Sequence, residues 1–365
     1  MRNSVFSGWK KYRNVKLALG DQLNQRAYLH SKPLLIHFEI NDRCNLQCIM
    51  CGRRSDSIPR DTGELDPGLI KRIAPWLVYA KYVGLAGNGE PFLHPQLFEI
   101  LEILHESNTV PSLVTNGTLL TRECLERLMG IGASILTVSF DGGSKETFES
   151  IRVGARFDQI LDSLEMLSRM KREKNSPFPV VNFLVCIQEK NKHELKEILH
   201  HAKRLGVPKV DFQTLFPFTD EGREYRIRDL GEIHRIFAPV FETSQTLGIE
   251  ASLSPLAFGL QERLQYEGRE FTPGLPLFCE NIWQTLHVDV KGNVRFCCFW
   301  IGSCLGNLSD KTIPELWNHP DFIALRDKIA KGIIPEQCAH CHALEIHNPE
   351  KIHSQYRIRM KHQND

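Results

Sequence analysis

Hydrophobic and polar positions follow a repeating pattern along residues 34–216. Each repeat has a short apolar run rich in β-branched residues, then a polar or glycine-containing turn, then a stretch with helical periodicity. Strands that alternate with helices in this way predict a parallel sheet with right-handed crossovers. The expected strands are residues 34–40, 81–87, 110–116, 134–140, 180–187 and 209–216.

Two of the intervening helices carry boundary signals. One begins with Asp66 as N-cap and Pro67 at the first helical position, and the stretch 156–174 is apolar at helical spacing with a basic last turn. The strands are nearly continuous apolar runs, which indicates a sheet covered on both faces. The predicted fold class is therefore α/β, and either an open doubly wound sheet or a curved partial barrel satisfies the pattern.

The pattern changes after residue 216. One amphipathic helix over 229–248 is followed by an irregular stretch that is rich in proline. Further on, apolar and polar residues alternate on both sides of a Lys-Gly-Asn turn within 283–299, which predicts a β-hairpin, and two short helical segments follow. The predicted units are an N-terminal helical segment (1–33), the α/β domain (34–216), a connector (217–275), a small α+β domain (276–347) and a polar tail (348–365).

Charge and hydropathy exclude several classes of protein. The formal net charge is +1, so nothing favours a nucleic-acid partner. The basic stretch 2–16 is interpreted as a solvated helical face packed over the main domain, in preference to a membrane-surface role. The chain has neither an apolar run of about 18 residues nor a signal peptide, which predicts a cytoplasmic protein without a membrane partner. In such a reducing compartment, eleven cysteines indicate metal ligands in preference to disulfides.

Three of the cysteines lie just after the first expected strand, at positions 44, 48 and 51. At this cysteine content, a chance match to the spacing is expected only about 0.01 times. The carboxyl end of a first strand is where parallel sheets carry their chemistry. Three thiolates there predict a four-iron cluster with one iron left open, whereas an electron carrier normally takes four cysteines. A zinc site completed by a distant histidine is the alternative.

The motif of Cys44, Cys48 and Cys51 resembles that of the radical S-adenosylmethionine (SAM) enzymes. This family has Cys-x3-Cys-x-aromatic-Cys, and the present chain has Met50 where the aromatic residue usually lies. Methionine keeps an apolar, polarizable surface at that position, and the spacing of the ligands is unchanged. The resemblance implies a partial (β/α)6 TIM-like barrel for residues 34–216.

Polar residues at the ends of the next strands extend the resemblance. Asn88-Gly89-Glu90-Pro91 is similar to the family's Gly-Gly-Glu-Pro motif, which receives the amino group of SAM. Glycine permits close approach of a backbone, and a carboxylate accepts from an ammonium group; a dinucleotide-binding loop would instead follow the first strand. The resemblance implies that further cofactor contacts come from Asn116, Ser139, Asp141 and Arg152, although Arg152 also fits a surface arginine on a helix.

A second set of cysteines lies in the C-terminal part. Cys279, Cys297, Cys338 and Cys341 bracket the expected hairpin and helices, and four cysteines saturate one cluster. The region resembles the SPASM domain, or its shortened twitch form, and the resemblance implies one auxiliary 4Fe-4S cluster on these four ligands, with zinc as the alternative.

The remaining cysteines and three histidines near the C-terminal set have other expected roles. Cys298 and Cys304 are rivals for the place of Cys297 as a ligand. We expect Cys124 and Cys186 in the core. The histidines at 340, 342 and 347 are expected to be solvated in preference to metal-bound.

The resemblance implies an enzyme that cleaves SAM to a 5′-deoxyadenosyl radical and removes a substrate hydrogen. The auxiliary cluster suits oxidation of the substrate radical, with reducing electrons from a donor such as flavodoxin or ferredoxin. A small molecule such as a sugar or cyclitol is the expected substrate, and Asn182 and Gln213 are barrel-facing candidates to contact it. A peptide-modifying maturase is the alternative enzyme, and a non-catalytic iron-sulfur electron-transfer protein is the alternative of another class.

Overall fold

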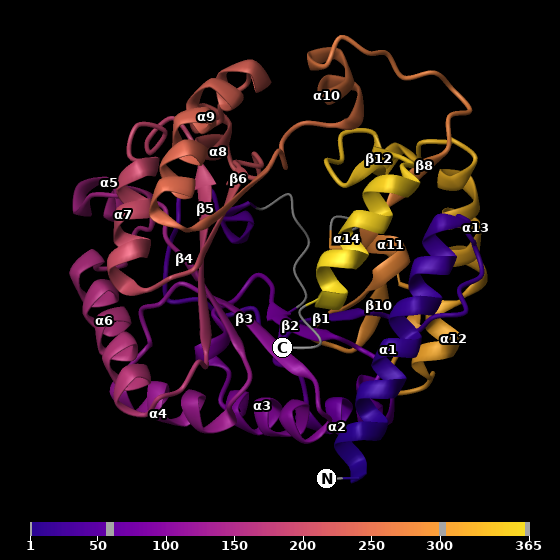
Figure 1. The fold of residues 1–365 in the computed structure, drawn as a ribbon, viewed down its shortest axis with the longest axis horizontal. Helices are drawn as coiled ribbons and strands as arrows, with labels where there is room; N and C mark the ends of the chain where they lie inside the picture. Colours follow the sequence, from indigo (N-terminus) through magenta and orange to yellow (C-terminus); the bar gives the residue numbers. More distant parts are fainter. Residues whose placement is uncertain (1, 56–61, 299–303, 362–365) are drawn as a thin grey trace.

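The computed structural model describes residues 2–55, 62–298 and 304–361. Its main body is a curved sheet whose parallel strands follow one another in chain order (Figure 1). The parallel strands are β1 (Leu35–Glu39), β2 (Tyr82–Ala86), β3 (Val110–Thr115), β4 (Ile135–Ser139), β5 (Val180–Ile187), β6 (Lys209–Thr214) and β7 (Glu250–Ser254). The sheet is curved but is not a closed barrel within the described residues, because β7 and β11 stand at its two edges.

Helices cover the outer face of this sheet, as the βα repeat predicts (Figure 1). Side chains such as Ile100 and Leu128 are fully buried between the helices and the strands. Asp66 caps its helix by accepting from Gly68 N–H at 2.8 Å, which confirms the predicted helix start. The helices that follow the strands in this part are α2 (Pro67–Leu77), α3 (Leu97–Glu106), α4 (Arg122–Ile131), α5 (Lys145–Ile151), α6 (Phe157–Glu173), α7 (Leu195–Leu205), α8 (Asp220–Tyr225) and α9 (Leu230–Leu247). The short 3-10 turns η1 (Gly52–Arg54) and η2 (Pro91–Leu93) lie in the loops after β1 and β2.

The segment predicted as a connector contributes to the sheet. After α9, β7 pairs in parallel with β6, so that Lys209 lies beside Glu250 and Gln213 beside Ser254. The sequence analysis missed this strand because Glu250–Ser254 contains a single large apolar residue, Leu253. The chain then passes through α10 (Leu260–Tyr266) to the C-terminal part.

The C-terminal part is joined to the sheet through β9, which pairs in parallel with β1 on the side opposite β2. β9 and β10 form the predicted antiparallel hairpin. Across the open centre of Figure 1, this part faces β6, α8 and α9. Its elements are β8 (Leu277–Cys279), α11 (Glu280–Gln284), β9 (Thr285–Val288), β10 (Asn293–Arg295), β11 (Gly306–Asn307), α12 (Ile313–Trp317), α13 (Pro320–Ala330), η3 (Glu336–Cys338), β12 (Leu344–Ile346) and α14 (Pro349–Lys361).

The two terminal segments pack against each other. The N-terminal helix α1 (Arg2–Leu23) contacts α11 and α14, and the side chain of Gln22 donates to the hydroxyl of Tyr356. Asn14 of α1 also donates to the carbonyl of Tyr79, after α2. The polar tail is therefore a docked helix.

Among the described residues, no helix combines the length and the apolar character needed to cross a membrane. The cytoplasmic location stays a prediction.

Arg326 of α13 links the N-terminal segment to the C-terminal helices. Its fully buried guanidinium group stacks on Phe322 and donates to three backbone carbonyls, and burial lowers its pKa to about 9. The acceptors are Ile282 O at 2.8 Å, Trp317 O at 2.9 Å and Ala27 O at 3.3 Å.

We expect Arg326→Ala to lower the free energy of unfolding by about 3–5 kcal/mol, because it leaves buried carbonyls without donors and opens a cavity. Lys328→Ala, on the exposed side of the same helix, is the matched control and should stay within about 0.5 kcal/mol. Urea unfolding of both variants followed by circular dichroism measures the difference. Equal stability of the two variants would contradict the assignment.

Candidate active site

The first cysteine loop leaves the carboxyl end of β1 and is fixed by backbone hydrogen bonds to the segment after α5. Gln47 N–H donates to Val153 O at 2.9 Å, and Ile49 N–H donates to Ile151 O at 3.1 Å. Cys48 is buried, whereas Cys44 and Cys51 are partly exposed. Burial raises the pKa of the Cys48 thiol, and the nearby Arg152 lowers it in part. The loop thus holds three thiols at the end of the sheet where the sequence predicts them.

The loop after β2 lies directly against the cysteine loop. Glu90 N–H donates to Arg43 O at 2.7 Å, and Asn41 Nδ2 donates to Glu90 O at 2.9 Å. A Cβ atom at Gly89 would lie 2.0 Å from Asn41 Oδ1 and 2.8 Å from Arg43 O. Glycine is therefore needed at position 89 for the two loops to approach each other.

Glu90 connects this loop to the end of β3. Its carboxylate accepts from Thr115 Oγ1 at 2.6 Å, from Asn116 N–H at 2.7 Å and from Phe92 N–H at 3.2 Å. Burial raises the pKa of Glu90, and these hydrogen bonds lower it in part. Because a carboxylate has about four acceptor positions, an amino group of a ligand can still donate to it.

Asp141 and Arg152 form an ion pair under the cysteine loop. Arg152 Nε donates to Asp141 Oδ2 at 2.6 Å, and Cys186 N–H donates to Asp141 Oδ1 at 2.6 Å. Arg152 Nη1 lies 3.8 Å from Cys48 Sγ. Burial acts to lower the pKa of Arg152, but the charges of Asp141 and Cys48 raise it by more. The arginine side chain is only 14% exposed, so it is not a surface residue.

One cavity of about 330 Å³ collects most of the predicted residues. It lies at the carboxyl ends of the strands, as expected for a barrel of this kind. Asn116 Nδ2 approaches Cys44 Sγ at 3.8 Å on its wall. The predicted residues that line the cavity are Cys44, Cys48, Cys51, Gly89, Glu90, Asn116, Ser139, Arg152 and Gln213.

Two of the residues predicted to contact SAM or the substrate do not line this cavity. Asp141 is fully buried, and it reaches the cavity only through its contact with Arg152. Asn182 shares a strand face with Leu184 and Cys186, because side chains alternate along β5, but it lies further from the carboxyl end. It is therefore deeper in the sheet interior than the cavity.

Several cavity residues were not predicted. Cys186, expected to be a core residue, is buried but lines the cavity beside Leu184. The period-two alternation of β5 carried this information, because residues 184 and 186 share the face of the candidate Asn182. Unpredicted apolar residues also come from the segments after β6 and β7: Leu215, Phe216, Phe218 and Leu256.

The four cysteines of the second set are brought together from separate elements. Cys279 ends β8, Cys338 ends η3, Cys341 follows it, and Cys297 follows the hairpin. Burial raises the pKa of Cys279, and the charges of Cys341, Cys297 and Cys338 raise it further. Burial and the charges of Cys341 and Cys297 raise the pKa of Cys338 to about 12. The four thiols are therefore close enough to influence one another's ionisation.

The remaining cysteines and histidines differ in their surroundings. Cys298 is exposed beside Cys297, and Cys304 is exposed with its thiol directed to Gly306 O at 3.6 Å. Cys124 is half-buried in α4, and burial raises its pKa to about 11. His340 is exposed, whereas His342 and His347 are half-buried: burial lowers the pKa of His342 to about 4, and the ring of His347 contacts Gln22 O at 3.0 Å.

The two cysteine sets supply the thiolates that the expected 4Fe-4S clusters need. A cubane needs one thiolate per iron, and a cationic iron core would offset the burial that opposes ionisation of Cys48 and Cys279.

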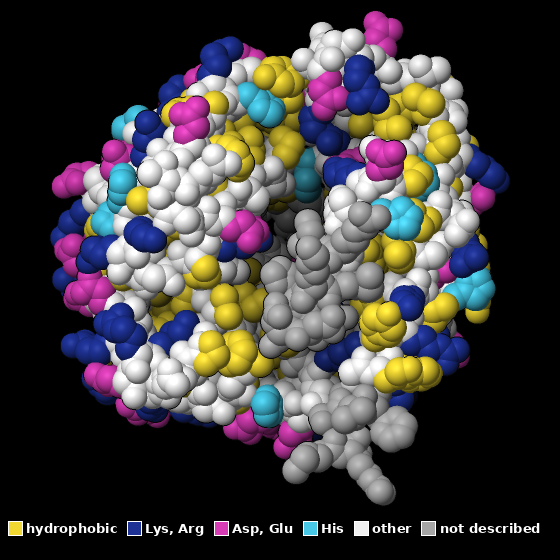
Figure 2. Space-filling model, in the orientation of Figure 1, with side chains coloured by type: hydrophobic (Ala, Val, Ile, Leu, Met, Phe, Trp, Pro, Cys, Tyr) yellow, Lys and Arg dark blue, Asp and Glu magenta, His cyan; other side chains and the backbone are white. Residues whose placement is uncertain are grey.

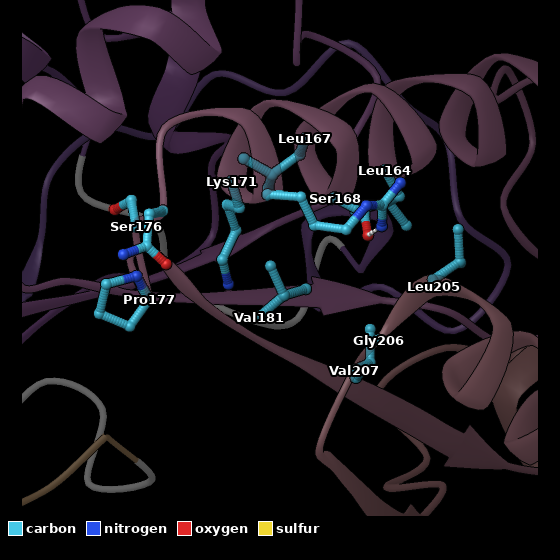
Figure 3. A pocket seen from close by; sticks show the side chains of 12 residues that line it. Leu164, Leu167, Ser168, Lys171, Ser176, Pro177, Val181, Leu205, Gly206 and Val207 are labelled. Atoms are coloured by element: carbon cyan, nitrogen blue, oxygen red, sulfur yellow. Dashed lines mark hydrogen bonds between the residues drawn. The ribbon is translucent and has the colours of Figure 1, made fainter.

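A second cavity, of about 480 Å³, lies beside α6 and the end of α7 (Figure 3). It is lined by apolar residues such as Leu164 and Val181, with Lys171 and Arg172 on its rim. Lys171 donates to Pro179 O at 2.8 Å, and Arg172 donates to Ser168 Oγ at 2.8 Å. Both cations are thus engaged, and the cavity contains no cysteine or carboxylate.

We expect Gly89→Ala to lower the free energy of unfolding by about 1–3 kcal/mol, because the added methyl group forces the two loops apart. The displacement should also weaken SAM binding. Gly130→Ala, on the exposed side of α4 with nothing within 4 Å of its Cβ position, is the control and should be neutral or slightly stabilising. Urea unfolding and isothermal titration with SAM measure the two effects, and equal behaviour of the variants would count against the loop contact.

Family models match both parts of the chain. The model described as the radical SAM superfamily matches residues 38–202, and the model described as an iron-sulfur cluster-binding domain, SPASM, matches residues 279–342. The two matches cover the two cysteine sets, since Cys44 to Cys51 lie in the first and Cys279 to Cys341 lie in the second. Both resemblances found in the sequence are thus confirmed.

Curated relatives agree with these matches. An AdoMet-dependent heme synthase of Methanosarcina barkeri is 28% identical over 312 residues, which are 81% of this chain and 85% of that protein. Mycofactocin maturase MftC of Mycobacterium tuberculosis is 30% identical over 176 residues, which are 48% of this chain and 43% of that protein.

Solved structures share the fold. Streptococcus suis SuiB bound to its precursor peptide SuiA superposes with a TM-score of 0.67 at 14% identity, over 89% of this chain and 73% of that one. Native anSMEcpe with bound AdoMet superposes with a TM-score of 0.60 at 19% identity, over 91% of this chain and 100% of that one. With a 4Fe-4S cluster and SAM as the cofactors of its first domain and an auxiliary iron-sulfur cluster in its second, the chain belongs to the radical SAM superfamily and carries a SPASM domain.

Proposed function

We propose that this enzyme oxidises an organic substrate by removing a hydrogen atom in the 330 Å³ cavity and sending the remaining electron to the second cysteine set. The observation that supports this most directly is the convergence of Cys44, Cys48 and Cys51 on a cavity that also contains Glu90 and Arg152. A non-catalytic cluster carrier has no use for these additional ligand-binding groups.

The cavity residues are assigned to the parts of SAM by their chemistry. Glu90, next to the close backbone approach at Gly89, accepts from the amino group. Arg152 pairs with the carboxylate of the methionine part. Asn116 and Ser139 supply hydrogen bonds to the ribose or the carboxylate. Asp141 acts as a positioning residue, because it holds the Arg152 guanidinium from below.

When bound and reduced, the cluster and SAM together supply methionine and a 5′-deoxyadenosyl radical. The chain's own residues hold the substrate near that position and limit the access of water. Phe216, Phe218 and Leu256 form an apolar wall, and Gln213 offers a polar group on the β6 side. Asn182 contacts the substrate only if the substrate extends below the cavity.

We assign Cys279, Cys297, Cys338 and Cys341 as the residues that would hold one auxiliary 4Fe-4S cluster. Four thiolates would leave no vacancy for substrate on that cluster, so it would serve as an acceptor of the electron. A donor such as flavodoxin or ferredoxin would supply the electron that the site of Cys44, Cys48 and Cys51 needs.

Two substrate classes fit this chemistry. A small molecule such as a sugar or cyclitol is one class, and Gln213 offers it a polar group beside the apolar residues after β6. A peptide is the alternative, supported by relatives whose names or structures concern peptides: SuiB bound to its precursor peptide, and a Bacillus subtilis protein of subtilosin biosynthesis that is 26% identical over 342 residues.

We expect anaerobically reconstituted wild-type protein, incubated with SAM and dithionite, to release 5′-deoxyadenosine and methionine. Cys48→Ser should lower the release by at least about 100-fold, because the first cluster loses a ligand. Cys124→Ser, a half-buried cysteine of α4, is the control and should retain wild-type release. Chromatography of the quenched mixture measures the product, and a wild-type protein that binds iron but releases none would refute the enzymatic assignment.

Cys338→Ser should remove only the auxiliary cluster. We expect the iron content to fall from about eight to about four per chain, with release of 5′-deoxyadenosine retained, because the first cysteine loop is untouched. Cys304→Ser, with its exposed thiol, should keep the full iron content. Iron analysis and electron paramagnetic resonance of the reduced protein distinguish the variants. A loss of iron in Cys304→Ser would instead make Cys304 a ligand.

A further inference from the structure

Strand β7 presents an unpaired edge. It pairs with β6 on one side, and within the described part of the chain no strand pairs with it on the other. Glu250 N–H donates to Pro208 O at 2.9 Å, so residues 250, 252 and 254 direct their backbone groups toward β6. Because backbone groups alternate in direction along a parallel strand, Ala251 and Leu253 direct theirs outward.

The outward edge of β7 borders a cleft of about 780 Å³. Glu250 and residues 252–255 form one side of it, and Phe278 of β8 and Ile346 of β12 lie on the C-terminal side. The molecule is hollowed near the centre of the face in Figure 2. At one end the cleft is bridged by Arg263 of α10, which donates to Leu344 O of β12. Leu253, one of the two residues with outward backbone groups, lines this cleft.

The cleft and the catalytic cavity are lined by neighbouring residues of the chain. Pro255 lines the cleft and the next residue, Leu256, lines the cavity. On β6, Lys209 lines the cleft, and Gln213, on the same strand face, lines the cavity. A ligand extended along β7 therefore leads from the cleft into the cavity. The second cysteine set lies next to this route, because Phe278 precedes Cys279.

The charges around the cleft are largely paired with one another. Lys209 Nζ lies 3.1 Å from Asp211 and 3.5 Å from Glu250, and Lys351 Nζ lies 2.5 Å from Glu345. Arg263 is engaged with the carbonyl of Leu344. A ligand that carries phosphates or several carboxylates would have to displace these pairs. The main chain of a polypeptide is uncharged and matches the outward donors and acceptors of Ala251 and Leu253.

We propose that β7 binds an extended segment of a polypeptide substrate as an added strand and leads the residue to be oxidised into the catalytic cavity. This inference rests on the proposed function and selects the polypeptide class of substrate. Strand addition obtains its affinity from main-chain hydrogen bonds and tolerates different side chains. The five residues of β7 offer an edge of about 17 Å at about 3.3 Å per residue.

The test uses a fluorescein-labelled octapeptide of alternating threonine and valine, titrated with the cluster-reconstituted protein in the absence of SAM. Fluorescence anisotropy should show saturable binding to the wild type. Leu253→Pro removes one outward N–H, a change that an edge strand tolerates, and should weaken binding at least about tenfold. Leu253→Ala keeps the N–H and shortens the side chain, and it should bind within about twofold of the wild type.

A second probe avoids any dependence on the folding of the proline variant. The same octapeptide, methylated on every backbone nitrogen, lacks the donors of a strand and should not bind the wild type. Equal binding of the two peptides, equal binding by Leu253→Pro and Leu253→Ala, or no binding of the octapeptide to the wild type would overturn the inference. Because the titration contains no SAM, its outcome is independent of 5′-deoxyadenosine release, which tests the proposed function separately.

Discussion

The parallel pairing of β1 on both of its sides is the constraint on which the rest of the structure depends. β2 lies on one side of β1 and β9 on the other, and both pairings are in parallel. The first cysteine loop leaves the carboxyl end of β1, and the hairpin that leads to Cys297 starts from β9. A single strand thus fixes the two cysteine sets relative to each other. If β1 slipped by one residue, its alternating side chains would exchange faces and the cysteine loop would lose its contacts with the loop after β2.

The electrostatics of the catalytic cavity follow from burial. Glu90, Asp141 and Arg152 are held in a site largely removed from water, where an unpaired charge is costly. Each is satisfied by named partners: three donors for Glu90, and the mutual pair of Asp141 and Arg152 with the added N–H of Cys186. These groups are therefore set in place before any ligand arrives, which reduces the reorganisation that binding requires.

Much of the fold could be predicted from the sequence because the buried strands are continuous apolar runs. The expected strand 180–187 coincides with β5, and 110–116 differs from β3 by one residue. β7 could not be predicted in this way, because an edge strand beside an open cleft needs little apolar surface and Glu250–Ser254 has little. Local spacing identified the cysteines of both sets. The alternation along β5 also indicated that Cys186 shares the face of Asn182, although this signal was not used. Local spacing could not show that Asp141 turns away from the cavity, because this depends on where β4 ends relative to its neighbours.

The packing of α1 against α14 has a consequence for how the chain is made. Gln22 contacts Tyr356 and His347, which emerge from the ribosome more than three hundred residues later. The contacts of α1 with α14 can therefore form only after these distant residues have been synthesised, whereas Asn14 of the same helix can meet Tyr79 much earlier. Contacts of such long sequence separation form late and slowly. The docking of α1 against α14 is accordingly expected to be a late event in folding.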